Sequence, residues 1–322
     1  MSAPPVTLQI SLAPSDYRHA QHLLPHQVRA WRGQFAELLL TVDFHRSSGR
    51  FSERWEEGRD RLLPFAQSLP GARVVTVDYG AEAQAKVAAE FFGGRRVPAK
   101  DFRGGPYYSY FFALAEARHD YVLHADSDMF FGGGSTTWLA EATAHMAAHP
   151  AVLFTAPRSG PPPIDVIPPR PSAAPEPSAF VVQNFDTMST RLFLLSRRHF
   201  AATIGALAPR RPPAWRDRIK ARVEGNPPED LPEHLFTSEM RARGLVRREF
   251  LGAAPGRWSL HPPYRCADFY ERLPELVRRV ETDDIPPAQR GDHDLNASMV
   301  DWSEALTALA HNRWWKRLLR RG

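Results

Sequence analysis

The feature that most constrains the fold is a regular alternation of strand-like and helix-like segments along the first 130 residues. Short apolar runs rich in Val, Leu and Thr predict strands at 6–12, 37–44, 73–79 and 121–126. Helical patterns separate them, running from the turn after residue 12 to about Phe35, from Trp55 to Phe65, and over 81–92 and 107–117. Because parallel strands need crossover connections of this kind, the sequence predicts an α/β fold with a mostly parallel sheet flanked by helices.

The remaining pattern predicts a single large domain with three parts. Residues 1–156 form a first half, residues 157–262 a second half, and residues 263–322 a helical C-terminal extension. A loop at 157–177 opens the second half, because nine prolines in 21 residues exclude a helix or an interior strand. Further strands are predicted at 151–156, 180–186, 190–196, 246–251 and from Trp258, the second and third as two strands or one bent strand. Further helices are predicted to begin after an N-cap at Ser135, at Arg197 and at about Ser298, to end before a C-cap at Gly244, and to span 269–280. Residues 210–228 are predicted to be a basic connector.

Composition places the chain among ordinary globular proteins and excludes several kinds of site. With 43% hydrophobic and 24% charged residues it can bury a sizeable core. Cys266 is the single cysteine, so an intrachain disulfide and a Cys-based zinc cluster are excluded, and we interpret this thiol as structural. The sequence has no apolar stretch of about 20 residues and no signal-peptide pattern at its start, so we expect a cytoplasmic protein. The formal charge of +5 suits a polyanionic ligand, but its concentration in helices and the tail argues against a nucleic-acid partner.

The predicted fourth strand stops on two carboxylates that are one residue apart. The mainly apolar run that starts at Tyr121 is followed directly by Asp126-Ser127-Asp128. In an open α/β sheet the carboxyl end of a strand is where ligands bind. Two aspartates at this spacing on a turning backbone can converge on one Mg²⁺ or Mn²⁺ ion, which commonly shares oxygen ligands with a diphosphate. The alternative, from the residues alone, is an Asp-rich turn whose carboxylates accept hydrogen bonds from backbone N–H groups.

Other polar residues are predicted at the same edge of the sheet. Asp43 and Asp78 end the second and third strands, and Ala13 opens the turn after the first. A basic loop before the helix at 107–117 adds Lys100 and Arg103, whose cationic groups suit phosphate or sugar oxygens. Turn chemistry for the aspartates and a solvated loop for the cations stay open as alternatives. The predicted ligand-binding set is Ala13, Asp43, Asp78, Lys100, Arg103, Asp126 and Ser127.

With strand-terminal acids, a basic loop before the fourth strand and Asp126-Ser127-Asp128 after it, the sequence resembles nucleotide-sugar glycosyltransferases of the GT-A fold. The resemblance covers residues 5–262 and implies a Rossmann-like α/β domain. It implies that the first half binds a nucleoside-diphosphate sugar of UDP or GDP type and that the second half binds a small-molecule or glycan acceptor. Mn²⁺ or Mg²⁺ on the Asp-x-Asp motif would hold the donor diphosphate.

The resemblance also implies roles for individual donor-side residues. Asp128 would bind the metal directly, and Asp126 would contact the ribose, or the metal through water. Asp43 would lie near the base. A late histidine on the metal is common in the family, and His261 matches that position.

On the acceptor side, the resemblance implies a catalytic base. Inverting members often carry an acidic pair some ten residues before the end of a helix, and the matching place here holds Pro232-Glu233-His234. Glu233 is therefore the expected base, with Asp230 and Glu229 as alternatives. The implied reaction is an inverting transfer of the sugar to an acceptor hydroxyl or amine.

Three other functions compete with this interpretation. HAD-like phosphohydrolases and phosphomutases would use Asp126 as nucleophile, but they carry the motif on an early strand and follow it with Thr, whereas Met129-Phe130 follows here. Sugar-nucleotide pyrophosphorylases would need a Gly-rich turn after the first strand, which is missing. The aromatic and basic tail at 312–321 suits either peripheral contact with an anionic membrane or packing on the domain, so a non-catalytic membrane-surface protein is the third alternative.

Overall fold

The computed structural model describes residues 3–46, 54–163 and 182–311. Most of the Pro-rich loop and the tail at 312–321 lie outside these ranges. The described residues form a mixed α/β domain around one ten-stranded sheet, as the sequence predicts. Within these ranges, every helix is too short or too polar to cross a membrane.

The first four strands form the parallel half of the sheet. They are β1 (Val6–Leu12), β2 (Glu37–Val42), β3 (Ala72–Thr76) and β4 (Tyr121–Asp126), in the order β3-β2-β1-β4. In the register, Leu12 pairs with Val42, and Ser11 pairs with Asp126. The carboxyl ends of β1, β2 and β4 therefore meet at one edge, which confirms the predicted placement of the strand-terminal residues.

The second half of the sheet is mixed in direction. The strand β8 (Leu192–Ser196) runs antiparallel to both β4 and β6 (Val152–Ser159). The other strands are β7 (Val182–Phe185), β9 (Val246–Phe250) and β10 (Trp258–Leu260), with β7 antiparallel to β9, and β9 and β10 parallel to β6. The two strands predicted around 180–196 are thus separate strands with different neighbours.

One strand, β5 (Phe130–Gly132), was not predicted, because it continues the apolar run that follows the Asp-Ser-Asp motif. It pairs antiparallel with β10. Gly132 is required there, because a Cβ at this position would overlap the indole ring of Trp258. The motif therefore lies in a short turn between two hydrogen-bonded strands.

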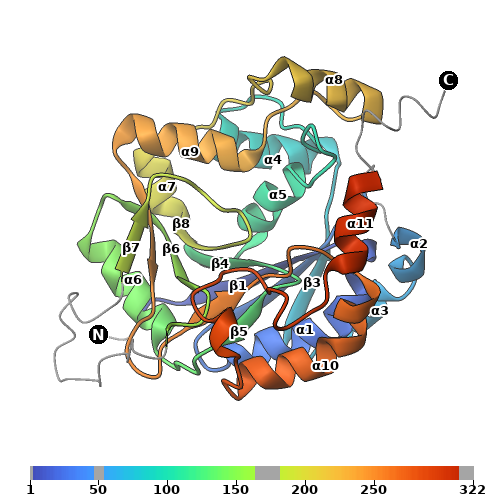
Figure 1. Ribbon diagram of the computed structural model, residues 1–322. Coiled ribbons are helices and arrows are strands. Elements are labelled where there is room, and N and C mark those ends of the chain that lie inside the picture. Colours follow the sequence, from blue (N-terminus) through green and yellow to red (C-terminus); the bar gives the residue numbers. More distant parts are fainter. Residues whose placement is uncertain (1–2, 47–53, 164–181, 312–322) are drawn as a thin grey trace.

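Helices cover both faces of the sheet (Figure 1). One buried cluster joins the sheet to α4 (Ala81–Phe92), α5 (Tyr108–Glu116), α7 (Arg197–Thr203) and α9 (Pro232–Arg243). A second cluster on the opposite face contains residues of α1 (Tyr17–Ala30), α3 (Leu62–Gln67) and α6 (Trp138–Ala148). Burial of apolar side chains on both faces is what holds a sheet of this kind in place.

The predicted C-terminal extension packs on the β5–β10 pair. It contains α10 (Ala267–Glu281) and α11 (Ser303–His311), whose buried residues share a third apolar cluster with Phe130 and Trp258. His26 of α1 contacts both β5 and α10. Its Nε2 accepts from the N–H of Phe131 in β5 at 2.9 Å. The proton must then lie on Nδ1, which donates to Glu281 Oε1 at 2.8 Å.

Several predicted boundaries were wrong. The helix α1 ends at Ala30 rather than near Phe35, because the turn that follows contains Gly33 at φ 77°. Pro25 lies inside this helix, which the fully buried side chains of Leu23, Leu24 and Gln27 hold against the domain. The stretch from Trp55 to Phe65 forms two short helices, α2 (Trp55–Gly58) and α3, because α2 ends at Gly58, a poor helix former. A short 3-10 turn at Pro14–Asp16 precedes α1.

Other differences lie at helix starts. Thr137, not Ser135, is the N-cap of α6, and α11 begins at Ser303 rather than Ser298. The predicted connector at 210–228 contains a ten-residue helix, α8 (Trp215–Glu224). Its prolines stand on either side of an uninterrupted helix-forming segment rather than within it, so they mark the ends of α8.

Candidate active site

The turn that carries Asp126, Ser127 and Asp128 is hydrogen-bonded to α1. Gln27 Nε2 donates to the carbonyl oxygens of Asp126 at 3.0 Å and of Met129 at 2.9 Å. These two carbonyl groups of the turn are therefore satisfied by Gln27, and the carboxylates of Asp126 and Asp128 make other contacts.

Asp128 is 4% exposed and lies between two basic side chains. Its Oδ2 accepts from Arg265 Nη2 at 2.7 Å and is 3.7 Å from His261 Nε2. Burial raises the pKa of the Asp128 carboxyl, but His261 and Arg265 together hold it well below its ordinary value. The other oxygen, Oδ1, is buried and has no hydrogen-bond partner within the described residues. A buried carboxylate oxygen without a donor is costly, so Oδ1 is suited to a ligand that brings positive charge.

Arg265 links Asp128 to the turn after β1. Its Nη1 lies 3.2 Å from Asp16 Oδ1, and Asp16 Oδ2 accepts from the N–H of Ala13 at 2.8 Å. Burial raises the pKa of Asp16, while Arg265 opposes that rise. The structure thus brings Ala13, one of the predicted ligand-binding residues, to the same cluster as Asp128.

Ser127 points toward α1. Its hydroxyl lies 3.0 Å from Nε2 of His19, a fully buried side chain. Burial lowers the pKa of His19 well below its ordinary value, so this imidazole is neutral. We call Asp16, His19, Asp128, His261 and Arg265 the strand-edge cluster.

Asp126 connects the motif to the predicted catalytic base. Its Oδ1 accepts from the hydroxyl of Tyr110 at 3.2 Å. Burial, Asp126 and Glu233 raise the pKa of Tyr110 well above its ordinary value, so it is a proton donor at neutral pH. The N–H and hydroxyl of Thr190 both donate to Glu233 Oε1 at 3.0 Å. Tyr110 is thus a neighbour of both Asp126 and Glu233.

Asp230, the other predicted catalytic residue, has a structural environment. It is 1% exposed, and its Oδ1 accepts from His234 Nδ1 at 2.6 Å and from the N–H of Leu231 at 2.9 Å. Arg210 Nε donates to its Oδ2 at 3.2 Å. These contacts hold the start of α9, so Glu233 in the first turn of that helix is the better placed of the two carboxylates.

Two further predicted residues, Asp43 and Lys100, form a buried ion pair. Lys100 Nζ donates to Asp43 Oδ2 at 2.8 Å, and both side chains are almost completely buried. The hydroxyl of Tyr79 donates to Asp43 at 3.1 Å, and the ring of His45 lies tilted against that of Tyr79 at 4.8 Å. Burial and Asp43 raise the pKa of Tyr79 well above its ordinary value. The end of β2 thus carries a buried polar cluster with aromatic neighbours.

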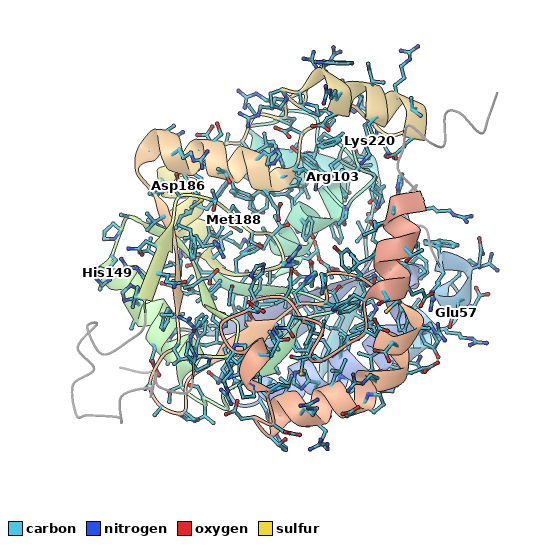
Figure 2. The ribbon with its side chains drawn as sticks, in the orientation of Figure 1. Glu57, Arg103, His149, Asp186, Met188 and Lys220 are labelled. Atoms are coloured by element: carbon cyan, nitrogen blue, oxygen red, sulfur yellow. The ribbon has the colours of Figure 1, made fainter. Side chains whose placement is uncertain are left out.

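Asp78 and Arg103 are not part of these contacts. Asp78 is exposed and accepts from the N–H of Gly80 at 2.7 Å, at the start of α4, which is the turn chemistry that stood as its alternative. Arg103 is exposed on the loop between α4 and α5, with its guanidinium 5.2 Å from the centre of the Phe102 ring (Figure 2). Their roles in ligand binding stay predictions.

The predicted metal ligands are only partly assembled. Across residues 3–46, 54–163 and 182–311, no group of three or more His, Cys, Asp and Glu side chains is arranged to hold a metal ion. Asp128 and His261 do meet, and Oδ1 of Asp128 is buried without a partner. Mg²⁺ and Mn²⁺ accept such a pair when substrate phosphates and water supply the other ligands, so the pair fits a shared site. Asp126 faces Tyr110, and its role as a metal ligand stays a prediction.

Sequence reasoning missed Arg265, His19, Tyr110 and Thr190. Arg265 follows His261 by four residues, so a scan for cations near the predicted metal histidine would have found it. His19 lies next to the turn after β1, which was already predicted at the sheet edge. Tyr110 and Thr190 gave no such signal, because their importance depends on the pairing of β4 with β8 and on the position of α9.

No protein-family profile matches the chain, and no curated protein matches it. Among solved structures, S. aureus TarS in complex with UDP-GlcNAc aligns at 11% identity over 88% of this chain and 68% of TarS, with a TM-score of 0.40. Glucosyl-3-phosphoglycerate synthase from Mycobacterium tuberculosis, in complex with Mn²⁺, UDP and glucosyl-3-phosphoglycerate, aligns at 11% identity over 86% and 78%, with a TM-score of 0.35. Mannosyltransferase PcManGT from Pyrobaculum calidifontis, in complex with GDP-Man and Mn²⁺, aligns at 12% identity over 65% and 48%, with a TM-score of 0.34. These values are too low to carry a functional argument, so function is inferred from the site.

Proposed function

We propose that this chain is a glycosyltransferase that moves a sugar from a nucleoside-diphosphate sugar of UDP or GDP type to an acceptor hydroxyl or amine. One observation carries the proposal. A buried aspartate with an unpartnered oxygen, Asp128, lies at the shared carboxyl edge of parallel strands, between Arg265 and His261. Such an edge is where α/β proteins bind nucleotides, and this charge arrangement suits a diphosphate.

On the donor side, Asp128 and His261 would hold Mn²⁺ or Mg²⁺, which would supply positive charge to the diphosphate. Arg265 is a second cation at the same place, because its guanidinium already contacts Asp128 and Asp16. Asp43 and Lys100, one strand away, would hold the base or ribose through their carboxylate and ammonium groups. All of these groups belong to the described domain.

On the acceptor side, Glu233 would remove the proton from the attacking hydroxyl or amine. Thr190 donates two hydrogen bonds to one carboxylate oxygen, which fixes the orientation of Glu233. The influence of both Asp126 and Glu233 on Tyr110 supports a position of this carboxylate near the Asp126 side of the motif. A base held close to the donor site supports a direct, inverting displacement at the anomeric carbon.

The test is thermal stability measured with UDP, GDP, dTDP and CMP, each with and without Mn²⁺. We expect one nucleoside diphosphate to raise the unfolding temperature, more strongly with Mn²⁺. Asp128→Asn should remove this shift, and Asp78→Asn is the matched control that should keep it. Stabilisation by none of the four nucleotides, or turnover of p-nitrophenyl phosphate that depends on Asp126, would overturn the proposal in favour of a phosphohydrolase.

A further inference from the structure

The helix α8 presents an unusual combination of exposed side chains. Trp215, Arg218, Ile219 and Arg222 follow i, i+3, i+4, i+7 spacing, so they share one face of the helix. Trp215 is 62% exposed and Ile219 is 42% exposed. Figure 1 shows α8 at the top of the molecule, on the far side of α4 and α9 from the sheet. Trp215 and Ile219 therefore do not pack against the buried core of the domain.

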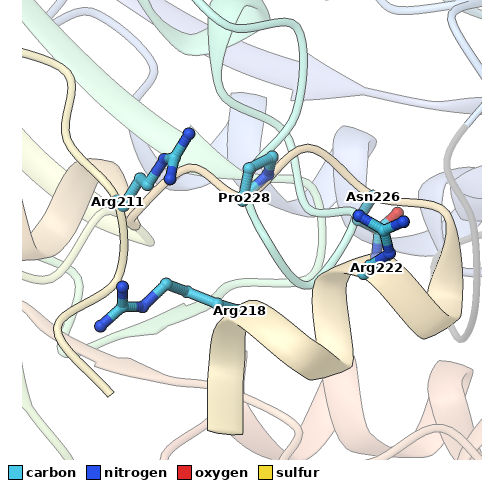
Figure 3. Close-up of a pocket in the computed structure, with 5 residues that line it drawn as sticks. All are labelled: Arg211, Arg218, Arg222, Asn226 and Pro228. Atoms are coloured by element: carbon cyan, nitrogen blue, oxygen red, sulfur yellow. The ribbon is translucent and has the colours of Figure 1, made fainter. Parts of the chain in front are cut away.

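Arginines surround this apolar pair. A cavity of about 300 Å³ lies between α8 and the segments on either side of it, and we call it the α8 pocket (Figure 3). It is lined by Arg211, Arg218, Arg222, Asn226 and Pro228. None of its three arginines forms an ion pair with a carboxylate within the described residues; Arg218 donates to the carbonyl of Pro213 at 3.1 Å.

Arg218 and Arg222 differ in this from surface arginines such as Arg29, Arg198 and Arg278, which contact acids. Burial raises the pKa of the Glu229 carboxyl and the charge of Arg211 opposes that rise, whereas a bound anion would supply the counter-charge of the other two arginines. Guanidinium groups bind phosphate oxygens with two parallel hydrogen bonds, so a phosphate group suits the cavity best. Lys220, labelled in Figure 2, adds a further cation on α8.

We propose that α8 docks on an anionic phospholipid surface, with Trp215 and Ile219 entering the headgroup region and the α8 pocket binding a lipid phosphate. A soluble phosphate would contact only the arginines, whereas a bilayer surface would contact both the arginines and the exposed apolar residues of this helix face. Trp is favoured at such interfaces because its ring is apolar while its N–H stays hydrated. The inference does not depend on the proposed transferase activity.

Two sets of variants in the full chain test the proposal by co-sedimentation with vesicles. The vesicles are pure phosphatidylcholine, or phosphatidylcholine with phosphatidylglycerol. We expect binding to the anionic vesicles only, weakened by salt. Replacing Arg211, Arg218 and Arg222 with Gln should lower affinity by about fivefold for each arginine. Replacing Trp215 and Ile219 with Ala should lower it about tenfold and remove the part that resists salt.

The matched control replaces three other exposed arginines, Arg32, Arg59 and Arg198, with Gln, so that the net charge changes equally. Affinity within about threefold of the original supports the α8 face as the docking element. Equal weakening by the control set would overturn the proposal, because net charge alone would then explain binding. The proposal would also be overturned if replacing Lys316 and Arg317 of the tail removed binding while the α8 variants kept it. The same holds for replacement of the exposed Leu306 and Leu309 of α11.

A final arm separates a lipid phosphate from a soluble one. Inorganic pyrophosphate is added to the free protein, and its binding is followed by calorimetry. Micromolar binding that the three Arg→Gln changes abolish, with no binding to anionic vesicles, would show that the α8 pocket serves a soluble anion and would overturn membrane docking. Binding to anionic vesicles that the three Arg→Gln changes weaken, without micromolar binding of pyrophosphate, would support it.

Discussion

The strand-edge cluster and the α8 pocket differ in how their charged side chains are paired. In the cluster, Asp128 is buried and Arg265 and His261 lie against it, so opposite charges are matched within the protein. In the pocket, Arg218 and Arg222 are exposed and meet no carboxylate within the described residues. Buried charges must be paired to be tolerated, whereas exposed cations need no partner until a ligand arrives. The difference matches the two proposals, a preformed donor site at the sheet edge and a surface that would acquire its counter-charge from outside.

The largest expected effect comes from Asp128→Asn. The amide keeps the size of the side chain but removes the charge that Arg265 and His261 share, so the cluster becomes cationic. We expect the nucleotide-dependent thermal shift in Mn²⁺ to disappear and sugar transfer to fall by about a thousandfold or more. The measurements are thermal melting with nucleotide and initial transfer rates. Full activity in this variant would show that the matched charges are structural only.

Glu233→Gln should have the next largest effect. Gln can still accept from Thr190 but cannot take a proton, so transfer should slow by about 10² to 10⁴-fold. Donor binding should be unchanged, which separates this variant from Asp128→Asn. Thermal shift with the preferred nucleotide serves as the control. Unchanged turnover would remove Glu233 as the base, and Glu229, whose pKa is raised by burial, would become the carboxylate to test next.

Lys100→Met tests the claim that pairing is obligatory at the sheet edge. It leaves Asp43 buried with only the Tyr79 hydroxyl and a backbone N–H, and it should cost about 3–5 kcal/mol of folding stability. Adding Asp43→Asn should restore much of that stability, because the uncompensated charge is removed. Urea denaturation of the single and double variants measures both. The same Lys→Met change at the half-buried Lys220 of α8 should cost much less.

A smaller effect concerns acid stability where α1 meets α10. The hydrogen bond from His26 and the contact with Arg29 lower the pKa of Glu281 from its ordinary 4.5 to about 2. A lowered folded-state pKa gives stability that is present above pH 4.5 and is lost as pH falls toward 2. Glu281 is about a third exposed, so solvent screening limits the effect to about 2 °C in unfolding temperature. Melting of Glu281→Gln should show this difference at pH 7 and none near pH 2.

The sequence predicted the sheet edge well because strand ends are encoded locally. The apolar runs, their lengths and the acids that follow them predicted β1, β2, β3 and β4. The three-residue strand β5 could not be recognised, because its pairing partner β10 lies about 130 residues away. Thr190 and Tyr110 were missed for the same reason: both contact the site through neighbours that only the folded topology supplies.

Predictions that rested on the average composition of a segment were wrong about its secondary structure. The prolines and arginines of 210–228 suggested a connector, but the helix-forming run between the prolines is α8. Averaging also concealed the i, i+3, i+4, i+7 spacing of Trp215, Arg218, Ile219 and Arg222, which the sequence already contained. The α8 face was therefore predictable in principle, whereas the contacts of Arg265 with Asp16 and Asp128 were not, since they join residues more than 130 positions apart.

The smallest expected effect, Asp78→Asn, separates two aspartates that look equivalent in the sequence. Asp43 and Asp78 each follow a strand of the parallel half, yet Asp43 is buried against Lys100, while Asp78 is exposed and its carboxylate accepts from the N–H of Gly80. Asn can accept the same backbone hydrogen bond, so stability should change by less than about 0.5 kcal/mol. Nucleotide-dependent thermal shift should also be unchanged. Loss of that shift in Asp78→Asn would mean that exposed acids at the sheet edge bind the donor too, and that burial with a matched partner does not mark its binding residues.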